Sequence, residues 1–316
     1  MIIKYRERPA KIAGYEALLR RISYNHPKRA QVQEKLSNTL AGLGGEERLD
    51  RMMDYFDPPY SYLVLQDLSL PSHCQIDTMI ITESRIFLLE VKNISGRLKF
   101  TTNPSALQKV LPNGEVKGLK SPLVQAANSK WKVEKMLRWI HCPLPVESII
   151  VIAYPSQIVE NVPLGAKVWS ADETFFQLMQ MEMGRPLISP EEMKALGEHF
   201  LTAHEPYNPF PLAEKFGIEL TAIETGVFCP HCRLKKMERF HRRWKCTDCN
   251  IFNVDAHHEA INEWFMLYKS TINTAECKNF LGLRNLVAAA RLLQSIGLEE
   301  MGGRRHRYYV QKVEKS

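Results

Sequence analysis

One stretch decides how this chain folds: Gln75-Ile-Asp-Thr-Met-Ile-Ile-Thr-Glu-Ser-Arg-Ile-Phe-Leu-Leu-Glu-Val-Lys-Asn93. It predicts two apolar, β-branched strands joined by a short polar turn at residues 82–85. Side chains two apart on a strand share a face, so Glu90 and Lys92 project together. Pairing of the two strands brings Asp77 beside them. Unpaired buried charges are costly, so these three side chains indicate a functional site rather than an ordinary core.

Metal-assisted hydrolysis of a phosphodiester bond is the chemistry that this trio suits. Asp77 and Glu90 supply hard oxygen ligands for Mg²⁺ or Mn²⁺. Such a cation polarises the phosphate and lowers the pKa of a bound water. Lys92 then orients or helps to deprotonate that water and offsets charge in the transition state. The alternative is an exposed hairpin with a Glu/Lys pair on its solvent face, because an E-x-K triplet also occurs by chance.

Three further motifs accompany the trio in a fixed order. They are Gly42-Leu-Gly-Gly45-Glu46, the Gly96 that follows Glu90-Val91-Lys92-Asn93, and Ser121-Pro-Leu-Val-Gln125. Over roughly residues 40 to 160 this arrangement resembles the NERD (nuclease-related) domain of the PD-(D/E)xK nuclease superfamily. The resemblance implies a restriction-endonuclease-like fold, an α/β domain with a mixed sheet flanked by helices, and nuclease activity. The proline of the superfamily motif is absent, since Ile76 precedes Asp77.

The resemblance also implies which residues form the active site: Glu46, Asp77, Glu90, Lys92 and Gln125. Glu46 is expected at the start of a helix that runs to about Phe56, with the adjacent Glu47 as an alternative for the same position. Without the resemblance, Glu46 is a favourable charge at a helix N-terminus. Gln125, likewise, is then no more than a helix-capping residue.

Composition describes a soluble protein with a basic tail. The 316 residues are 45% hydrophobic and 24% charged, which is typical of globular proteins and sufficient for two or three domains. The sequence has no apolar run of about 20 residues and no N-terminal signal core, so we expect a cytoplasmic protein without a membrane span. The net charge of +7 lies in residues 226–316, which hold 16 basic and 9 acidic side chains. This excess indicates a polyanionic partner, although a solvated tail also explains it.

Five segments are expected along the chain. Residues 1–39 form a basic helical leader that packs against the nuclease body or touches nucleic acid, and residues 40–203 form the nuclease-like domain. Residues 204–225 form a proline-containing linker, 226–254 a zinc ribbon and 255–316 a winged-helix-like module. Within the nuclease-like domain we expect a strand at 61–67, a strand at 96–102 that continues the same sheet, a buried central strand at 146–153, and a hairpin that turns at 112–114. A helix from Pro122 to about His141 is expected to be capped by Ser121.

The zinc ribbon is predicted from two paired cysteine motifs thirteen residues apart. Cys229, Cys232, Cys246 and Cys249 supply four thiolates, and because four ligands fill a tetrahedral zinc shell, this zinc is structural. The residues between the motifs are mostly basic and interleave with Phe240 and Trp244, a composition suited to phosphates and base stacking. The basic residues are Arg233, Lys235, Lys236, Arg239, Arg242, Arg243 and Lys245. For Trp244, a place in the thin core of the ribbon is an equal alternative.

The C-terminal segment predicts three helices followed by a basic hairpin near residues 300–310. This order is typical of a winged helix, with one helix in the major groove and the hairpin on the backbone. The candidate nucleic-acid contacts are Arg284, Arg291, Arg304, Arg305 and Arg307. A small helical interaction module with Leu286, Leu292 and Leu293 in its core is the alternative.

Together these patterns predict a magnesium-dependent nuclease in which the tail binds nucleic acid, expected to be DNA, and the body cuts it. The alternative is a DNA-binding or regulatory protein that keeps the nuclease fold without turnover, because a fold does not guarantee a function. The sequence gives no indication of an oligomeric state.

Overall fold

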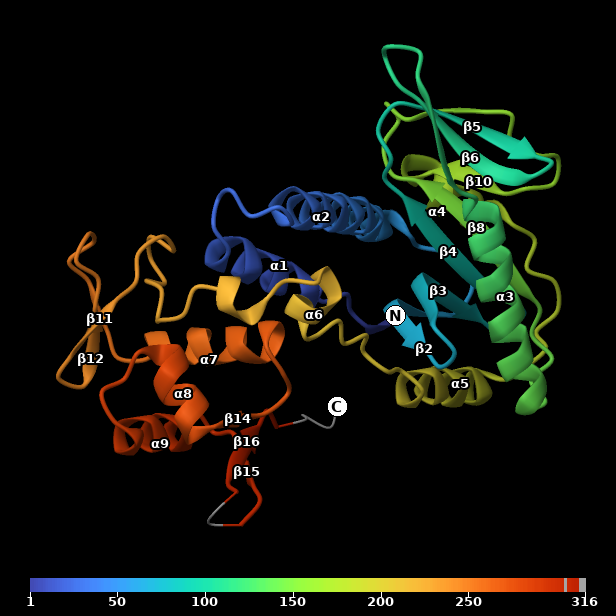
Figure 1. Ribbon diagram of the computed structural model, residues 1–316. Coiled ribbons are helices and arrows are strands. Elements are labelled where there is room, and N and C mark those ends of the chain that lie inside the picture. Colours follow the sequence, from blue (N-terminus) through green and yellow to red (C-terminus); the bar gives the residue numbers. More distant parts are fainter. Residues whose placement is uncertain (304–305, 313–316) are drawn as a thin grey trace. The chain divides into compact units, whose positions relative to one another are not determined.

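The computed structural model describes residues 1–303 and 306–312. The chain divides into two compact units, each made from two separate stretches (Figure 1). Unit 1 contains Met1–Arg8 and Thr39–Tyr207, and unit 2 contains Pro9–Asn38 and Asn208–Ser316. The predicted leader is therefore divided between the two units after Arg8.

A six-stranded mixed sheet forms the centre of unit 1. Its strands, in spatial order, are β1 (Ile2–Lys4), β2 (Tyr62–Leu70), β3 (Cys74–Thr82), β4 (Ile86–Lys92), β8 (Val146–Ile152) and β10 (Val168–Ser170). β2, β3 and β4 pair antiparallel, whereas β4, β8 and β10 run parallel, and β1 lies parallel to β2. The predicted hairpin is confirmed, with Ile81 opposite Ile86 across its turn. The buried strand predicted at residues 146–153 is also confirmed as β8.

Helices cover both faces of this sheet because its central strands are apolar on both sides. Ile86 and Leu88 pack with α3 (Pro122–Trp139) and α5 (Pro190–Thr202). The alternate residues Phe87 and Leu89 pack with the C-terminal part of α2 (Arg29–Met52) and with α4 (Ala171–Gln180). A short 3₁₀ helix, η1 (Met53–Tyr55), follows α2. The predicted cap of α3 is present, since the Ser121 side chain accepts a hydrogen bond from the backbone N–H of Val124.

A second, four-stranded sheet contains β7 (Val116–Lys120), β6 (Ser105–Val110), β5 (Arg97–Thr102) and β9 (Ile158–Glu160), in that order. The prediction that residues 96–102 continue the main sheet is wrong. Gly96 has φ +99°, which redirects the chain after β4, and β5 then pairs with β6 and β9 instead. The hairpin predicted at 112–114 is confirmed, with Gly114 at φ +83° in its turn.

The prediction that a helix begins next to Glu46 is also wrong. α2 begins at Arg29, so Glu46 lies in its last two turns, where the helix N-terminus has no influence on it. Gly42, Gly44 and Gly45 all have negative φ within the helix. Glycine weakens a helix by only about 1 kcal/mol per residue, and the packing of buried Leu49 against the sheet compensates for that.

Unit 2 joins its two stretches around one hydrophobic core. α1 (Ala10–Arg21) packs with α6 (Leu212–Phe216) and α7 (Ala256–Leu267). The buried Arg21 guanidinium donates to Glu263 of α7 at 2.7 Å. The leader helix α1 therefore packs within unit 2. The stretch predicted as a linker contains α6 and a short 3₁₀ helix, η2 (Leu220–Ala222), and buries Leu212.

The rest of unit 2 comprises the cysteine region and a helical module. The elements are β11 (Glu238–Phe240), β12 (Arg243–Lys245), β13 (Phe252–Asn253), β14 (Ile272–Asn273), α8 (Thr274–Leu281), α9 (Leu286–Ser295), β15 (Glu299–Met301) and β16 (Tyr308–Val310). β11, β12 and β13 form one antiparallel sheet, and β14, β16 and β15 form another. Trp244 and Cys246 share a buried cluster with Ala260 and Leu293, so both regions use one core. The predicted boundary between them, at 254/255, remains a prediction.

None of the helices in the described part of the chain is both long enough and apolar enough to cross a lipid bilayer.

Candidate active site

Asp77 lies where the pairing of β3 and β4 ends. The two strands are in register from Ile81 opposite Ile86 to Thr78 opposite Leu89. At the next residue the side chain of Asp77, rather than its backbone carbonyl, is the acceptor. The backbone N–H of Val91 donates to Asp77 Oδ2 at 2.8 Å. The side chain is buried. A carboxylate held by a backbone donor in the core has a fixed direction, and this bond satisfies one of its oxygens.

Glu90 and Lys92 share a face of β4 and meet Gln125 from the first turn of α3. Lys92 Nζ donates to Glu90 Oε1 at 2.6 Å and to Gln125 Oε1 at 3.0 Å. Gln125 Nε2 donates to Glu90 Oε1 at 2.5 Å, which closes a triangle of three side chains. The structure thus brings together three of the predicted residues in one hydrogen-bonded cluster, with Asp77 on the neighbouring strand.

Glu46 reaches the same region through an arginine that sequence reasoning missed. Arg6 Nη1 donates to Glu46 Oε2 at 2.6 Å, and Arg6 Nε donates to Asp50 Oδ2 at 2.8 Å. The same guanidinium donates to the backbone carbonyl of Asp77 at 2.7 Å. Only 4% of the Arg6 side chain is exposed, so it is a buried link between α2 and β3. Among the residues that the structure describes, none forms a contact of this kind with Glu47, the predicted alternative.

Arg6 is placed there by β1, which pairs with β2. The backbone N–H of Arg6 also donates to the Gln66 side chain at 2.9 Å, and Lys4 Nζ donates to the carbonyls of Gln66 and Asp67. β1 has only three residues and no alternating pattern, so the local sequence does not predict a strand that positions Arg6. Asp50, one turn after Glu46 on α2, was missed as well, because its place in the site depends on its hydrogen bond to Arg6.

Glycine permits α2 to approach the end of β4. A Cβ added at Gly45 would lie 2.6 Å from the Asn93 Cβ and 3.2 Å from the Ala153 Cβ. Asn93 also donates through Nδ2 to the Ala41 carbonyl at 2.7 Å and accepts a hydrogen bond from Gln157. The glycine before Glu46 therefore has a packing reason: it lets the helix that carries Glu46 lie directly on the strand end that carries Glu90.

Burial raises the pKa values of all three carboxyl groups. Burial, with a contribution from the charge of Asp77, raises the pKa of Glu46 to about 8 and that of Glu90 to about 7. Burial also raises the pKa of Asp77, opposed by its hydrogen bond from Val91 and by the charge of Lys92. Carboxyl groups that share one site in this way are stabilised in their charged forms by a cation, and such clusters often mark functional sites.

Residues 41–153 match a family model, that of NERD, the nuclease-related domain. The chain carries a NERD domain. This confirms the recognition made from the sequence, and the matched region includes Glu46, Asp77, Glu90, Lys92 and Gln125. Arg6 lies outside it. Neither a curated protein nor a solved structure was found that matches the chain.

The donor atoms of the NERD domain suit a divalent cation bound to oxygen. Asp77 Oδ2 is engaged by Val91, so its other oxygen and the Glu90 carboxylate are the ligands that the protein offers. Mg²⁺ is commonly held by one or two carboxylates, with water and substrate phosphate completing its shell. Glu46 does not join a tight group with them: among the described residues, the cysteine cluster alone brings three or more potential ligand atoms within 4.8 Å of one another.

That cysteine cluster consists of Cys229, Cys232, Cys246 and Cys249. The Sγ atoms of Cys232 and Cys246 are 4.0 Å apart, close to the roughly 3.8 Å that tetrahedral Zn–S bonds of about 2.3 Å require. The four predicted ligands therefore form one site that fits a structural metal ion.

The basic residues predicted to contact nucleic acid are mostly at the surface of unit 2. Arg233, Lys235, Lys236, Arg242, Arg243, Arg284 and Arg291 are exposed, whereas Arg239, Lys245 and Arg307 are half-buried. Arg304 and Arg305 lie outside the described residues. Trp244 is buried at 2% exposure, so its ring serves the core and is not available to a base. Phe240 remains half-exposed at 48%.

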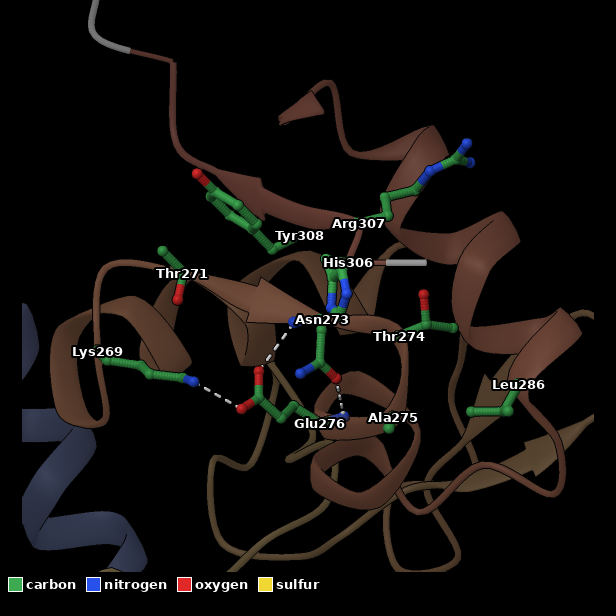
Figure 2. Close-up of a pocket in the computed structure, with 10 residues that line it drawn as sticks. All are labelled: Lys269, Thr271, Asn273, Thr274, Ala275, Glu276, Leu286, His306, Arg307 and Tyr308. Carbon is green, nitrogen blue, oxygen red and sulfur yellow. Dashed lines mark hydrogen bonds and ion pairs between the residues drawn. The ribbon is translucent and has the colours of Figure 1, made fainter. Parts of the chain in front are cut away.

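A pocket of ≈ 850 Å³ lies between α8, β14 and the residues before β16 (Figure 2). Lys269, His306 and Arg307 are among the residues that line it, and Arg307 is paired with Glu300. Glu276 reduces the positive charge of the pocket, since it pairs with Lys269 and caps α8 through the backbone N–H of Asn273. The pocket therefore offers a mixed polar surface rather than a dedicated anion site, and it belongs to unit 2, not to the carboxylate cluster.

Proposed function

We propose that this protein is a nuclease that hydrolyses phosphodiester bonds in DNA and depends on Mg²⁺ or Mn²⁺. The observation that carries the proposal is the cluster of Asp77, Glu90, Lys92 and Gln125 inside the NERD domain. A buried carboxylate pair with a lysine and an amide is expensive to keep in a protein interior. Metal-assisted hydrolysis is a reaction that uses each of these groups.

In this mechanism the protein holds its groups in fixed directions before the substrate arrives. Asp77 and Glu90 hold the cation, which supplies positive charge at the phosphate and lowers the pKa of a bound water. Lys92 orients the attacking water and offsets the charge that develops on the phosphate oxygens. Gln125 holds both Glu90 and Lys92 in position, and we assign it a contact to the phosphate. Glu46, fixed by Arg6, assists as a further carboxylate at the edge of the site.

Unit 2 is proposed to bind nucleic acid. We assign a structural Zn²⁺ to its four cysteines, and the element order α7, β14, α8, α9, β15, β16 supports a winged-helix-like module. The exposed basic residues around the cysteines and on α9 supply phosphate contacts. The cytoplasmic location expected from the sequence remains a prediction.

A catalytically silent DNA-binding protein is the second candidate. The number of exposed basic residues in unit 2 favours it, because they account for nucleic-acid binding without any chemistry at Glu90. The two candidates make opposite predictions for cleavage and the same prediction for binding.

The test uses the whole chain, because α1 packs on α7 and removal of residues 226–316 would expose the buried face of α1. Plasmid and linear single-stranded DNA are incubated with Mg²⁺, Mn²⁺ or EDTA. The proteins compared are the wild type, Lys92→Ala and the control Lys99→Ala, which removes an exposed lysine of β5. We expect cleavage that needs the metal and falls at least about 100-fold in Lys92→Ala alone. Retained DNA binding without cleavage under any condition would establish the second candidate.

A further inference from the structure

α3 connects the candidate active site to an exposed face that no function has yet explained. Gln125 lies in its first turn, against Glu90 and Lys92, and the helix continues to Trp139. At 1.5 Å per residue this is a length of about 21 Å. Val133 and Leu137 on one side of the helix are buried in the core of unit 1. The opposite side is exposed along the whole helix.

Two tryptophans lie on this exposed side. Trp131 is 56% exposed and Trp139 is 86% exposed. Together with Val124 and Lys135 they recur at intervals of seven and four residues, which places them on one face of an α-helix. Single exposed apolar residues are ordinary, but a row of large aromatic rings on one helix face marks an interaction surface.

The charge of α3 indicates the kind of partner. The helix carries four basic residues and one acidic residue. Lys130 pairs with Glu134, and Lys132 donates to the carbonyls of Ser72 and His73. Among the described residues, Lys135 and Arg138 have no ion-pair partner, and Lys135 Nζ lies 5.6 Å from the centroid of the Trp131 ring. Exposed aromatic rings beside unpaired cations are the combination that binds single-stranded nucleic acid.

We propose that the exposed face of α3 is a binding track for one strand of nucleic acid with unpaired bases. Trp131 and Trp139 stack on bases, Lys135 and Arg138 contact phosphates, and the strand leads to Gln125. At about 3.4 Å or more per nucleotide, the track accommodates about six nucleotides or fewer. That such a strand is then cut rests on the proposed function, but its binding does not.

Two other occupants fit the observations less well. A membrane surface takes up the apolar face of an amphipathic helix, and the apolar face of α3 is already packed against the sheet. A second copy of the chain would bring Lys135 and Arg138 close to the same residues of the other copy if the contact were symmetric, and like charges repel. Both occupants are therefore outcomes that the experiment must be able to detect.

The experiment localises the bound strand directly, because unit 2 is proposed to bind nucleic acid as well. A twelve-nucleotide thymidine oligonucleotide with 5-iodouracil substitutions is bound to the full chain without added Mg²⁺ or Mn²⁺, irradiated and mapped by peptide mass spectrometry. We expect crosslinks at Trp131 and Trp139. In fluorescence anisotropy, alanine at either tryptophan should weaken binding of this strand by about 5- to 100-fold, with little change for a duplex of equal length.

Matched variants control for exposure and charge. Phe176→Ala removes a 55% exposed ring from α4, and Lys194→Ala removes an exposed lysine from α5, as the comparison for Lys135→Ala. Both controls should bind as the wild type does. Circular dichroism of each variant verifies that the change has not unfolded α3.

Crosslinks confined to unit 2, together with equal affinities of all variants for the single strand, would overturn the proposal that α3 binds it. Cleavage by the same proteins in a separate assay with Mg²⁺ or Mn²⁺ would then leave the proposed function intact. Conversely, crosslinks on α3 without any cleavage would support the track and reject the nuclease. A dimer that dissociates in Trp139→Ala, or binding to phosphatidylglycerol vesicles that this change abolishes, would show that α3 serves another partner.

Discussion

Replacement of Arg6 by methionine should destabilise the part of unit 1 that holds the candidate active site, although Arg6 lies far outside the matched family region. The Arg6 guanidinium is buried and makes charged hydrogen bonds to Glu46 at 2.6 Å and Asp50 at 2.8 Å. Removal of one partner from a buried ion pair typically costs 3–5 kcal/mol, because a charge remains without compensation. The two carboxylates are about one-fifth exposed and partly rehydrate, so we expect about 3 kcal/mol for unit 1.

Hydrogen exchange is the appropriate measurement, since a single melting temperature is poorly defined for a chain with two units. A loss of 3 kcal/mol corresponds to roughly 150-fold faster exchange of the slowest amides of β2 and β3. Arg51→Met, which removes an exposed arginine from the same helix, is the control and should change exchange little. The double variant with Asp50→Asn should lose less than the sum of the two single losses.

Amide exchange rates of β2 and β3 in Arg6→Met that lie within a factor of about two of the wild-type rates would refute this role of Arg6. Equal losses in unit 1 and unit 2 would also count against it, because within the described residues the side-chain hydrogen bonds of Arg6 all go to groups of unit 1.

Three further predictions concern other sites. Gly45→Ala should lower the free energy of unfolding by about 1–3 kcal/mol and reduce cleavage, because the added Cβ would collide with Asn93. Gly42→Ala, where the added Cβ meets open space, is the control and should have neither effect. Denaturant unfolding measures both changes. Cys246→Ser should lose one equivalent of bound zinc by mass spectrometry and destabilise unit 2. Burial lowers the pKa of His257 to about 4 from an ordinary 6.5, so between these pH values the unfolded chain binds a proton more readily than the folded one. The contribution of His257 to the free energy of unfolding is therefore complete above pH 6.5 and is lost as the pH falls towards 4. His257→Gln should remove this pH dependence, up to about 3 kcal/mol, from the stability of unit 2.

The elements with strong local signals were predictable from the sequence. The apolar runs on either side of the polar turn at residues 82–85 predict a hairpin, and Ser121 followed by Pro122 predicts the start of α3. The paired cysteine motifs specify a cluster regardless of the rest of the fold. In each case the residues that decide the structure are neighbours in the sequence.

The features that escaped prediction depend on distant partners. β1 becomes a strand only because Val64 and Leu65 are beside it, sixty residues later, and this pairing brings Arg6 to Glu46. Composition also could not separate Trp244, which is buried, from the exposed Trp131, since both are flanked by basic residues. The interior position of a tryptophan is decided by tertiary packing rather than by its neighbours in the chain.

The packing of α1 has a consequence for how the protein is made. α7, which covers α1 and supplies Glu263, leaves the ribosome about 235 residues after α1. At about 5–20 residues per second, translation takes roughly 10 to 50 s to deliver that partner. Throughout this interval the apolar side of α1, including Ile12 and Leu18, has no core to enter. During that interval the apolar face of α1 lacks the cover of α7, and transiently exposed hydrophobic surface of this kind is prone to aggregation.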